Sequence, residues 1–205
     1  MKNIKKENRS VKKTKEKLKE GLILLLNEKP TSEVKVKELC ELVDINRGTF
    51  YYHYTDVFDL LRKVQEEFLE EFNNIIIDMN IKTIPKQKAS IIIEKVFSFF
   101  DKNAKLSEVL LGPNGDMGFI QQIKESVDEK CSDIWKDAGS HMKEEEYELF
   151  NSYIINGFIG MLETWLKNGR VQSPKYMSNF VATMIIPAAV YTLALDSDVL
   201  SREKK

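Results

Sequence analysis

Apolar residues recur along this chain at intervals of three and four positions, and no stretch alternates apolar and polar residues cleanly. That spacing is typical of helices with one buried face, whereas a half-buried strand has a period of two. We therefore predict an all-α fold with nine helices and no internal repeat. The first helix is expected around an apolar stripe from Val11 to Leu25, the second runs from Val36 to Asp44, the third begins at Asn46, and the fourth runs from about Thr55 towards Ile77. The other five helices are expected at about 86–102, 106–111, 117–138, 143–168 and 174–195.

The second and third predicted helices are short and are separated only by Asp44, Ile45 and Asn46. Two short helices joined in this way form a helix-turn-helix. Asparagine is also a favoured capping residue at the start of a helix. The stretch NRGTFYYHYTD, which begins at Asn46, therefore forms a helix that carries most of a dense cluster of aromatic side chains.

A helical wheel gives these aromatic residues two different roles. With Phe50 turned towards the core, Tyr54 and Arg47 lie within about 60° of it, and we expect Phe50 and Tyr54 to pack. Glycine in a helix costs about 1 kcal/mol relative to alanine, so close approach of the backbone to a ligand would explain Gly48. Hydroxyl, methyl and imidazole groups on such a face suit phosphate oxygens and base edges in a DNA major groove. The far side and the flanks hold Gly48, Thr49, Tyr51, Tyr52 and His53.

Charge is distributed unevenly along the chain. The net charge of −1 divides into +5 for residues 1–63, with fifteen Lys/Arg against ten Asp/Glu, and −6 for residues 64–205. A basic N-terminal surface and an acidic remainder suggest that only the first part binds a polyanion. The alternative is a lysine-rich tail that is merely solvated.

Composition and length place the chain among ordinary globular proteins. With 205 residues, 42% of them hydrophobic, it can bury one good core or two small ones. The longest apolar run, MIIPAAVYTLAL, is too short to span a membrane and contains a proline. The basic N-terminus lacks the apolar segment of a secretion signal, so we expect a cytoplasmic location and no membrane partner.

No arrangement of residues typical of catalysis is present in the sequence. His53 and His141 are isolated, no serine or cysteine has a neighbouring base, and no phosphate-binding glycine loop occurs. Cys40 and Cys131 are too far apart in the sequence for a metal-ligand spacing and are expected to be small buried hydrophobic residues. We expect no enzyme activity, no metal and no cofactor.

The segment KVKELCELVDINRGTFYYHYTDVFDLL resembles the DNA-binding domain of the TetR family of bacterial transcriptional regulators. The family pattern runs T-V-R-x-I-A-x-x-A-G-V-S-x-G-T-x-Y-x-x-F-x-x-K-x-x-L, and the resemblance covers residues 10 to about 65 without a break in spacing. The matching positions are Val36, Lys37, Leu39, Val43, Ile45, Gly48, Thr49, Tyr51, Tyr54 and Leu60.

This resemblance implies a helix-turn-helix domain at 1–63 with a basic tail at 1–9, followed by a helical regulatory and dimerisation domain at 64–205. The third helix would enter the major groove of a double-stranded, near-palindromic operator, and Lys37 would contact phosphate from the second helix. The residues implied in DNA binding are Lys35, Lys37, Asn46, Arg47, Gly48, Thr49, Tyr51, Tyr52 and His53.

Three positions depart from the family pattern. Lys35 replaces a capping threonine, and Val57 replaces the lysine that binds phosphate from the start of the fourth helix. Asp44 replaces the glycine of the turn, a conformation that aspartate adopts at some energetic cost. One ionic contact with DNA is therefore missing, and the basic tail is a candidate replacement.

The predicted helices at 143–168 and 174–195 carry more apolar surface than a single neighbour can cover. The resemblance implies that these helices pair with those of a second copy in a four-helix bundle, and the alternative is a monomer that buries both internally. The residues predicted at the dimer interface are Phe150, Ile154, Gly157, Met161, Met177, Val181, Met184, Ala188 and Tyr191.

The C-terminal segment around Gly157, Trp165 and Pro174 is also similar to the TetR branch that includes the regulator of dihydroxyacetone kinase operons. Members of that branch can act through a protein partner, so two functions stay open: a repressor released by a small apolar or aromatic effector, and a partner-dependent activator. The effector-binding residues expected for the first are Phe97, Phe100, Phe119, Ile123, Trp135, Tyr153 and Asn156, although an aromatic stripe of this kind also suits a plain core.

Overall fold

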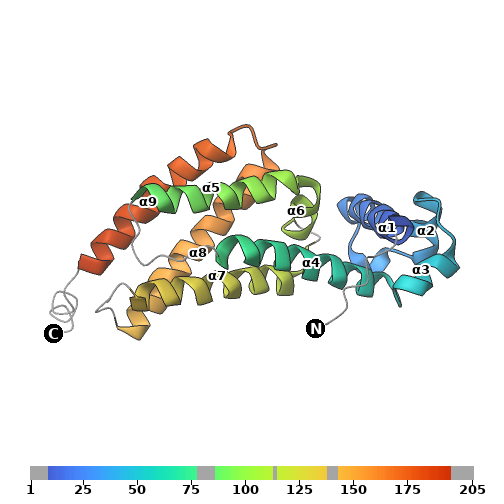
Figure 1. Ribbon diagram of the computed structural model, residues 1–205, viewed down its shortest axis with the longest axis horizontal. Coiled ribbons are helices and arrows are strands. Elements are labelled where there is room, and N and C mark those ends of the chain that lie inside the picture. Colours follow the sequence, from blue (N-terminus) through green and yellow to red (C-terminus); the bar gives the residue numbers. More distant parts are fainter. Residues whose placement is uncertain (1–8, 78–85, 113–114, 138–142, 195–205) are drawn as a thin grey trace. The chain divides into compact units, whose positions relative to one another are not determined.

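The computed structural model confirms an all-α fold (Figure 1). It describes residues 9–77, 86–112, 115–137 and 143–194, and this part of the chain contains nine α-helices and one short 3₁₀ helix that the sequence did not predict. The helices are α1 (Arg9–Glu28), η1 (Thr31–Glu33), α2 (Val36–Leu42), α3 (Arg47–His53), α4 (Val57–Ile77), α5 (Lys86–Lys102), α6 (Ala104–Leu110), α7 (Met117–Asp137), α8 (Glu144–Lys167) and α9 (Pro174–Ala194).

The chain forms two compact units. Unit 1 contains residues up to Leu69 together with Val109–Asp116, and unit 2 contains Glu70–Glu108 and the residues from Met117 onwards. The domain boundary expected after residue 63 stays a prediction. None of the described helices is long and apolar enough to cross a membrane.

The core of unit 1 depends on a close crossing of α1 and α2. The buried face of α1 is formed by Leu18, Leu22 and their neighbours one turn apart. Gly21 lies within this face, and a Cβ atom placed on it would be 2.3 Å from Val43 Cγ1. Only a residue without a side chain lets the two helices approach this closely. Gly21 therefore fixes the distance between α1 and the end of α2.

The turn of the helix-turn-helix is stabilised by local backbone geometry. Asp44 has a φ of 52°, a left-handed conformation that is rare in residues other than glycine. The Ile45 N–H then donates to the Cys40 carbonyl at 3.0 Å, which satisfies one of the last carbonyls of α2. Aspartate therefore performs the turn that glycine performs in the family pattern, as the sequence predicted.

In unit 2, α5 packs along α9, and α7 contacts α8 (Figure 1). Aromatic rings fill the space between α5 and its neighbours. Phe97 lies 5.4 Å from Phe158 and 5.3 Å from Trp165, measured between ring centroids, and both partners are on α8. The last helical turns of α4 contribute Phe72, whose ring is 5.8 Å from that of Phe100. These contacts tie α4, α5 and α8 into one core.

Arg170 holds the turn between α8 and α9 against α5 and α6. It has a φ of 54° and follows Gly169, which has a φ of 74°. Its guanidinium donates to Asp101 Oδ1 of α5 at 2.5 Å, and its Nε lies 3.7 Å from Glu108 Oε1 of α6. One side chain therefore joins the α8–α9 turn to α5 and α6, which lie more than sixty residues earlier in the sequence.

We predict that Gly21→Ala destabilises unit 1. Alanine gains helix propensity, but its methyl group would overlap Val43 Cγ1, and overpacking of this kind costs about 1–3 kcal/mol. Chemical denaturation followed by circular dichroism measures the change. Glu20→Ala, on an exposed position of the same helix, serves as the control and should be nearly neutral. Equal or greater stability of Gly21→Ala would show that α2 can move away without penalty.

Candidate nucleic-acid interface

The third helix presents two chemically different faces. Phe50 is fully buried and Tyr54 nearly so, with ring centroids 5.7 Å apart. On the opposite side Tyr52 is 81% exposed, and Thr49 is also exposed. The rotation of α3 is therefore fixed by its inward aromatic residues, and its polar face points to solvent as the wheel predicted.

The first turn of α3 is capped by Asn46. The Gly48 N–H donates to Asn46 Oδ1 at 2.7 Å, which satisfies one of the free N–H groups at the helix start. A Cβ atom on Gly48 would meet only this same oxygen, at 3.2 Å. Apart from the cap, the space beside Gly48 is open, so a phosphate or a base edge can approach the backbone there.

Arg47 lies in solvent, although the wheel placed it near the buried side of α3. It is the first residue of the helix, where no neighbouring helix covers it, and its guanidinium lies 6.0 Å from the centre of the Tyr51 ring. Tyr51 itself contacts Phe50 edge to face at 5.5 Å, and the Tyr52 ring meets His53 in the same way at 4.9 Å. These contacts restrict the directions in which the exposed polar groups point.

Lys35 and Lys37 are both exposed at the start of α2. Lys35 occupies the capping position and makes no side-chain hydrogen bond to the helix. Lys37 forms only a long ion pair with Glu41, at 3.8 Å, between two well-exposed side chains. Such surface pairs contribute little stability, so Lys37 can exchange Glu41 for a phosphate.

Other basic residues of unit 1 have structural ion pairs. Lys29 donates to Glu38 at 2.6 Å, and Arg62 donates to Asp59 at 2.6 Å. Lys63 donates to Asp59 at 3.0 Å and to the His53 carbonyl at 3.1 Å. The basic tail predicted at 1–9 lies outside the described residues except for Arg9.

Asp59 connects α3, the following turn and α4. Its carboxylate accepts from the Thr55 N–H at 3.0 Å, and then from Lys63 and Arg62, and these contacts lower the pKa of Asp59 to about 2. Because Lys63 also donates to the backbone carbonyl of His53, the last residue of α3, the Asp59 carboxylate holds the end of this helix in place through Lys63. Val57, where the family pattern has a phosphate-binding lysine, is buried and packs at the start of α4.

The residues predicted to bind an effector are divided between the core and the surface. Phe97, Phe100, Phe119 and Ile123 are buried in unit 2. Tyr153 is 72% exposed, and Asn156 is exposed and accepts from Lys124 at 2.8 Å. The side chain of Trp135 lies outside the described residues. The structure therefore brings four of the seven residues into the interior, and their role as an effector site stays a prediction.

The residues predicted at the dimer interface are similarly divided. Met177 and Val181 are buried within unit 2, on α9, which packs along α5. Met184 is 54% exposed, and a Cβ atom on Gly157 would meet nothing within 4 Å. Three further positions on α8 are partly covered: Phe150, Ile154 and Met161. The side chains of Ala188 and Tyr191 lie outside the described residues.

Two exposed aromatic residues on α9 were not among the residues predicted at the dimer interface. The rings of Tyr176 and Phe180 are nearly parallel, with centroids 6.5 Å apart, and both side chains face solvent. Their spacing of four positions indicates that they share one face of the helix. The sequence does not show which apolar face of α9 is covered by α5. An exposed aromatic pair beside Met184 extends the surface available to a partner.

Cys40 is buried, as the sequence predicted, whereas Cys131 is only partly covered, so the prediction of burial was wrong for Cys131. Burial raises the pKa of Cys40, and burial next to Asp128 raises the pKa of Cys131 to about 11. Both side chains are free of disulfide bonds. Since the thiolate is the nucleophile and metal ligand, neither cysteine is prepared for that chemistry near neutral pH.

Comparison with known proteins points to one family. A family described as "Transcriptional regulator C-terminal region", of the TetR type, matches residues 87–187. A curated relative, the uncharacterized HTH-type transcriptional regulator YxbF of Bacillus subtilis, is 21% identical over an alignment of 196 residues that covers 92% of this chain. The chain spans about half (49%) of the length of that relative.

Solved structures share the fold across most of this chain. A TetR transcriptional regulator from Streptococcus agalactiae superposes with a TM-score of 0.60 at 19% identity, covering 86% of this chain and 96% of its own. The dihydroxyacetone kinase operon activator DhaS superposes with a TM-score of 0.56 at 15% identity, covering 85% of this chain and 94% of its own. At these identities the likeness establishes the fold.

We predict that Asp59→Asn destabilises unit 1 at neutral pH and that the difference disappears in acid. The folded-state pKa of about 2 lies below the ordinary value of 3.8. Such a group stabilises the fold above its unfolded pKa, and the contribution is lost as the pH falls through the folded pKa. The free energy of unfolding of both proteins, measured with urea between pH 7 and pH 2, should differ at neutral pH. The difference should begin to shrink below about pH 4 and be nearly gone at about pH 2.

Glu66→Gln is the matched control for this prediction, because Glu66 is an exposed residue of α4 that pairs with Arg62 alone among the residues the structure describes. Its effect should be smaller at every pH. If the stability difference between the parent and Asp59→Asn were the same at pH 7 and at pH 2, the proposed role of the Asp59 carboxylate would be wrong.

Proposed function

We propose that this chain, which belongs to the TetR family of transcriptional regulators, binds a specific near-palindromic operator in double-stranded DNA as a homodimer and represses transcription until a small effector releases it. Such a protein acts in the cytoplasm, where the chromosome of a bacterium lies. The function class follows from the family, and the operator, the dimer and the effector are proposals argued below.

The exposed face of α3 is the observation that carries this proposal. Its side chains offer hydrogen-bond donors and acceptors in a helix that is capped, anchored and turned outwards. An α-helix fits the major groove, where hydroxyl and methyl groups read base edges and cations bind phosphate. No other described surface of unit 1 combines a short helix of fixed rotation with such a face.

Individual residues take different roles in this proposal. Thr49 and Tyr52 are farthest from the buried side of α3 and would contact bases or the adjoining backbone. Arg47 and Lys37 would bind phosphate, since within the described residues Arg47 forms no ion pair with a carboxylate and Lys37 has only a weak partner, Glu41. His53, half-buried at the helix end, would fix the register on the backbone together with Tyr51.

The dimer is proposed to form through α8 and α9. Their exposed apolar side chains include Tyr153, Phe180 and Met184, and Gly157 leaves the surface of α8 open to close approach. Met177 and Val181 would support this surface from beneath rather than touch the partner, because α5 already covers that side of α9. A dimer also allows two recognition helices to contact successive major grooves.

Repression needs the fewest additional assumptions. Occupying an operator can by itself exclude polymerase, whereas activation also requires a surface that recruits another protein. The second candidate, a partner-dependent activator, is favoured by the likeness of the fold to DhaS, which is named as an activator. A reporter gene placed behind the selected operator separates the two, since deletion of this protein raises expression in one case and lowers it in the other.

Selection from a random DNA pool should enrich a near-palindromic site, and Thr49→Ala or Tyr52→Ala should weaken binding to that site by about 1–3 kcal/mol. Fluorescence anisotropy with the selected duplex measures the change. Binding to a scrambled duplex of equal length is the control and should be much less affected, because phosphate contacts dominate it. Unchanged affinity of both variants for the selected site would reject α3 as the reading helix.

Met184→Glu should separate the subunits, because it places a charge on an exposed apolar position of α9. Light scattering at micromolar concentration should report a dimer for the parent chain and a monomer for the variant. Met117→Glu is the matched control, since Met117 is even more exposed but lies at the start of α7. If Met184→Glu remains a dimer, the interface lies elsewhere.

A further inference from the structure

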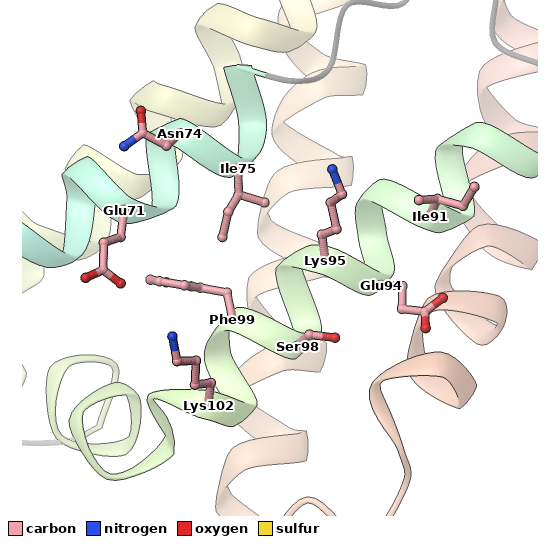
Figure 2. Close-up of a pocket in the computed structure, with 9 residues that line it drawn as sticks. All are labelled: Glu71, Asn74, Ile75, Ile91, Glu94, Lys95, Ser98, Phe99 and Lys102. Carbon is pink, nitrogen blue, oxygen red and sulfur yellow. The ribbon is translucent and has the colours of Figure 1, made fainter.

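A groove of about 760 Å³ runs between the end of α4 and α5 in unit 2 (Figure 2). Its volume is within the range of small-molecule sites. None of the residues predicted from the sequence as an effector site lines it. Its walls are Glu71, Asn74 and Ile75 from α4, and Ile91, Glu94, Lys95, Ser98, Phe99 and Lys102 from α5.

The floor of the groove is apolar. Phe99 is almost fully buried and contacts Phe72 and Phe100, so its ring is held in a fixed position. Ile75 lies beside it on α4, and Ile91 is half exposed farther along α5. An apolar group placed over Phe99 would therefore lose contact with water on a surface that is already formed.

Two charges of opposite sign stand on opposite walls of this floor. Glu71 and Lys102 flank the Phe99 ring in Figure 2, one on α4 and the other at the end of α5. Neither side chain forms an ion pair or hydrogen bond within the part of the chain that the structure describes. The two other charged residues of the walls already have partners: Glu94 is paired with Lys175 of α9 at 2.9 Å, and Lys95 also has a partner of its own.

From this arrangement we infer that the groove binds a small zwitterion with an apolar body, of the chemical class of the hydrophobic α-amino acids. The ammonium group would bind Glu71, the carboxylate would bind Lys102, and the side chain would cover Phe99 and Ile75. A simple anion would meet the repulsion of Glu71, and a simple cation that of Lys102. Only a ligand with both charges satisfies both walls.

The position of Lys102 gives binding a route to the rest of unit 2. Lys102 is the last residue of α5 and follows Asp101, which holds Arg170. Arg170 in turn lies against Glu108 of α6. A ligand that draws Lys102 inwards would therefore act on the end of α5, where α8, α9 and α6 are joined. This regulatory consequence rests on the proposed function, whereas binding itself does not.

Isothermal titration of the full chain with three probes of similar shape tests the inference. The probes are L-phenylalanine, 3-phenylpropanoate, which lacks the ammonium group, and 2-phenylethylamine, which lacks the carboxylate. L-phenylalanine should bind at least about tenfold more tightly than either of the other two, because removing one charge leaves one wall without a partner.

Substitutions assign each charge to its wall. Glu71→Gln should reduce the affinity for L-phenylalanine to that for 3-phenylpropanoate, and Lys102→Gln should reduce it to that for 2-phenylethylamine. The matched controls are Glu70→Gln and Lys105→Gln, which remove neighbouring exposed charges that do not line the groove and should leave the affinity unchanged.

Three outcomes would overturn the inference: no binding of L-phenylalanine, equal binding of all three probes, or binding that Glu71→Gln and Lys102→Gln do not alter. The proposed function is tested separately, by operator binding without a probe. A chain that binds L-phenylalanine but no operator would retain this site and reject the regulator, and the reverse result would reject only the site.

Discussion

The burial of Phe50 is the constraint on which the rest of unit 1 depends. A helix of seven residues has too few internal hydrogen bonds to be stable alone, so its position must come from packing. With Phe50 inside the core and Tyr54 beside it, α3 has only one rotation about its axis. The outward direction of Thr49 and Tyr52 is a consequence of that rotation. The face of α3 proposed to contact DNA is therefore positioned by hydrophobic packing on the opposite face.

The same constraint is reinforced at both ends of α3. At its start, Asn46 caps the first turn, and Asp44 supplies the left-handed residue that brings the chain there. At its end, Lys63 binds the His53 carbonyl and is itself held by Asp59. The Asp59 side chain is largely covered, and burial by itself would raise its pKa; three cationic or N–H donors converge on the carboxylate, and their hydrogen bonds lower the pKa instead. The helix is thus restrained by polar contacts that surround an apolar anchor.

How far the sequence could predict this depends on the range of the interactions. Periodicity, the Asn46 cap and the buried role of Phe50 are local properties of a few residues, and the structure agrees with them. The unusual backbone of Asp44 could be predicted because the family pattern has glycine there. The face of α9 covered by α5 could not, since several faces of α9 are apolar and only the tertiary packing selects one. The groove between α4 and α5 could not be predicted from the sequence either. Glu71 and Lys102 are far apart in the sequence and belong to no common motif, so only the packing of the two helices brings them together.

Regulation in such a protein requires that an effector distinguish two states of the chain. A ligand shifts an equilibrium only by its difference in affinity for the two states, and about a 100-fold difference is enough to release most of the protein from DNA. The end of α5 is suited to create that difference. Asp101 and Lys102 are adjacent, and Arg170 already fixes the first of them to the α8–α9 turn. The helix that follows, α6, begins in unit 2 and has its last two residues in unit 1. A ligand that changes the geometry at Lys102 would therefore act on an ion-paired part of unit 2 from which the chain continues, through α6, into unit 1.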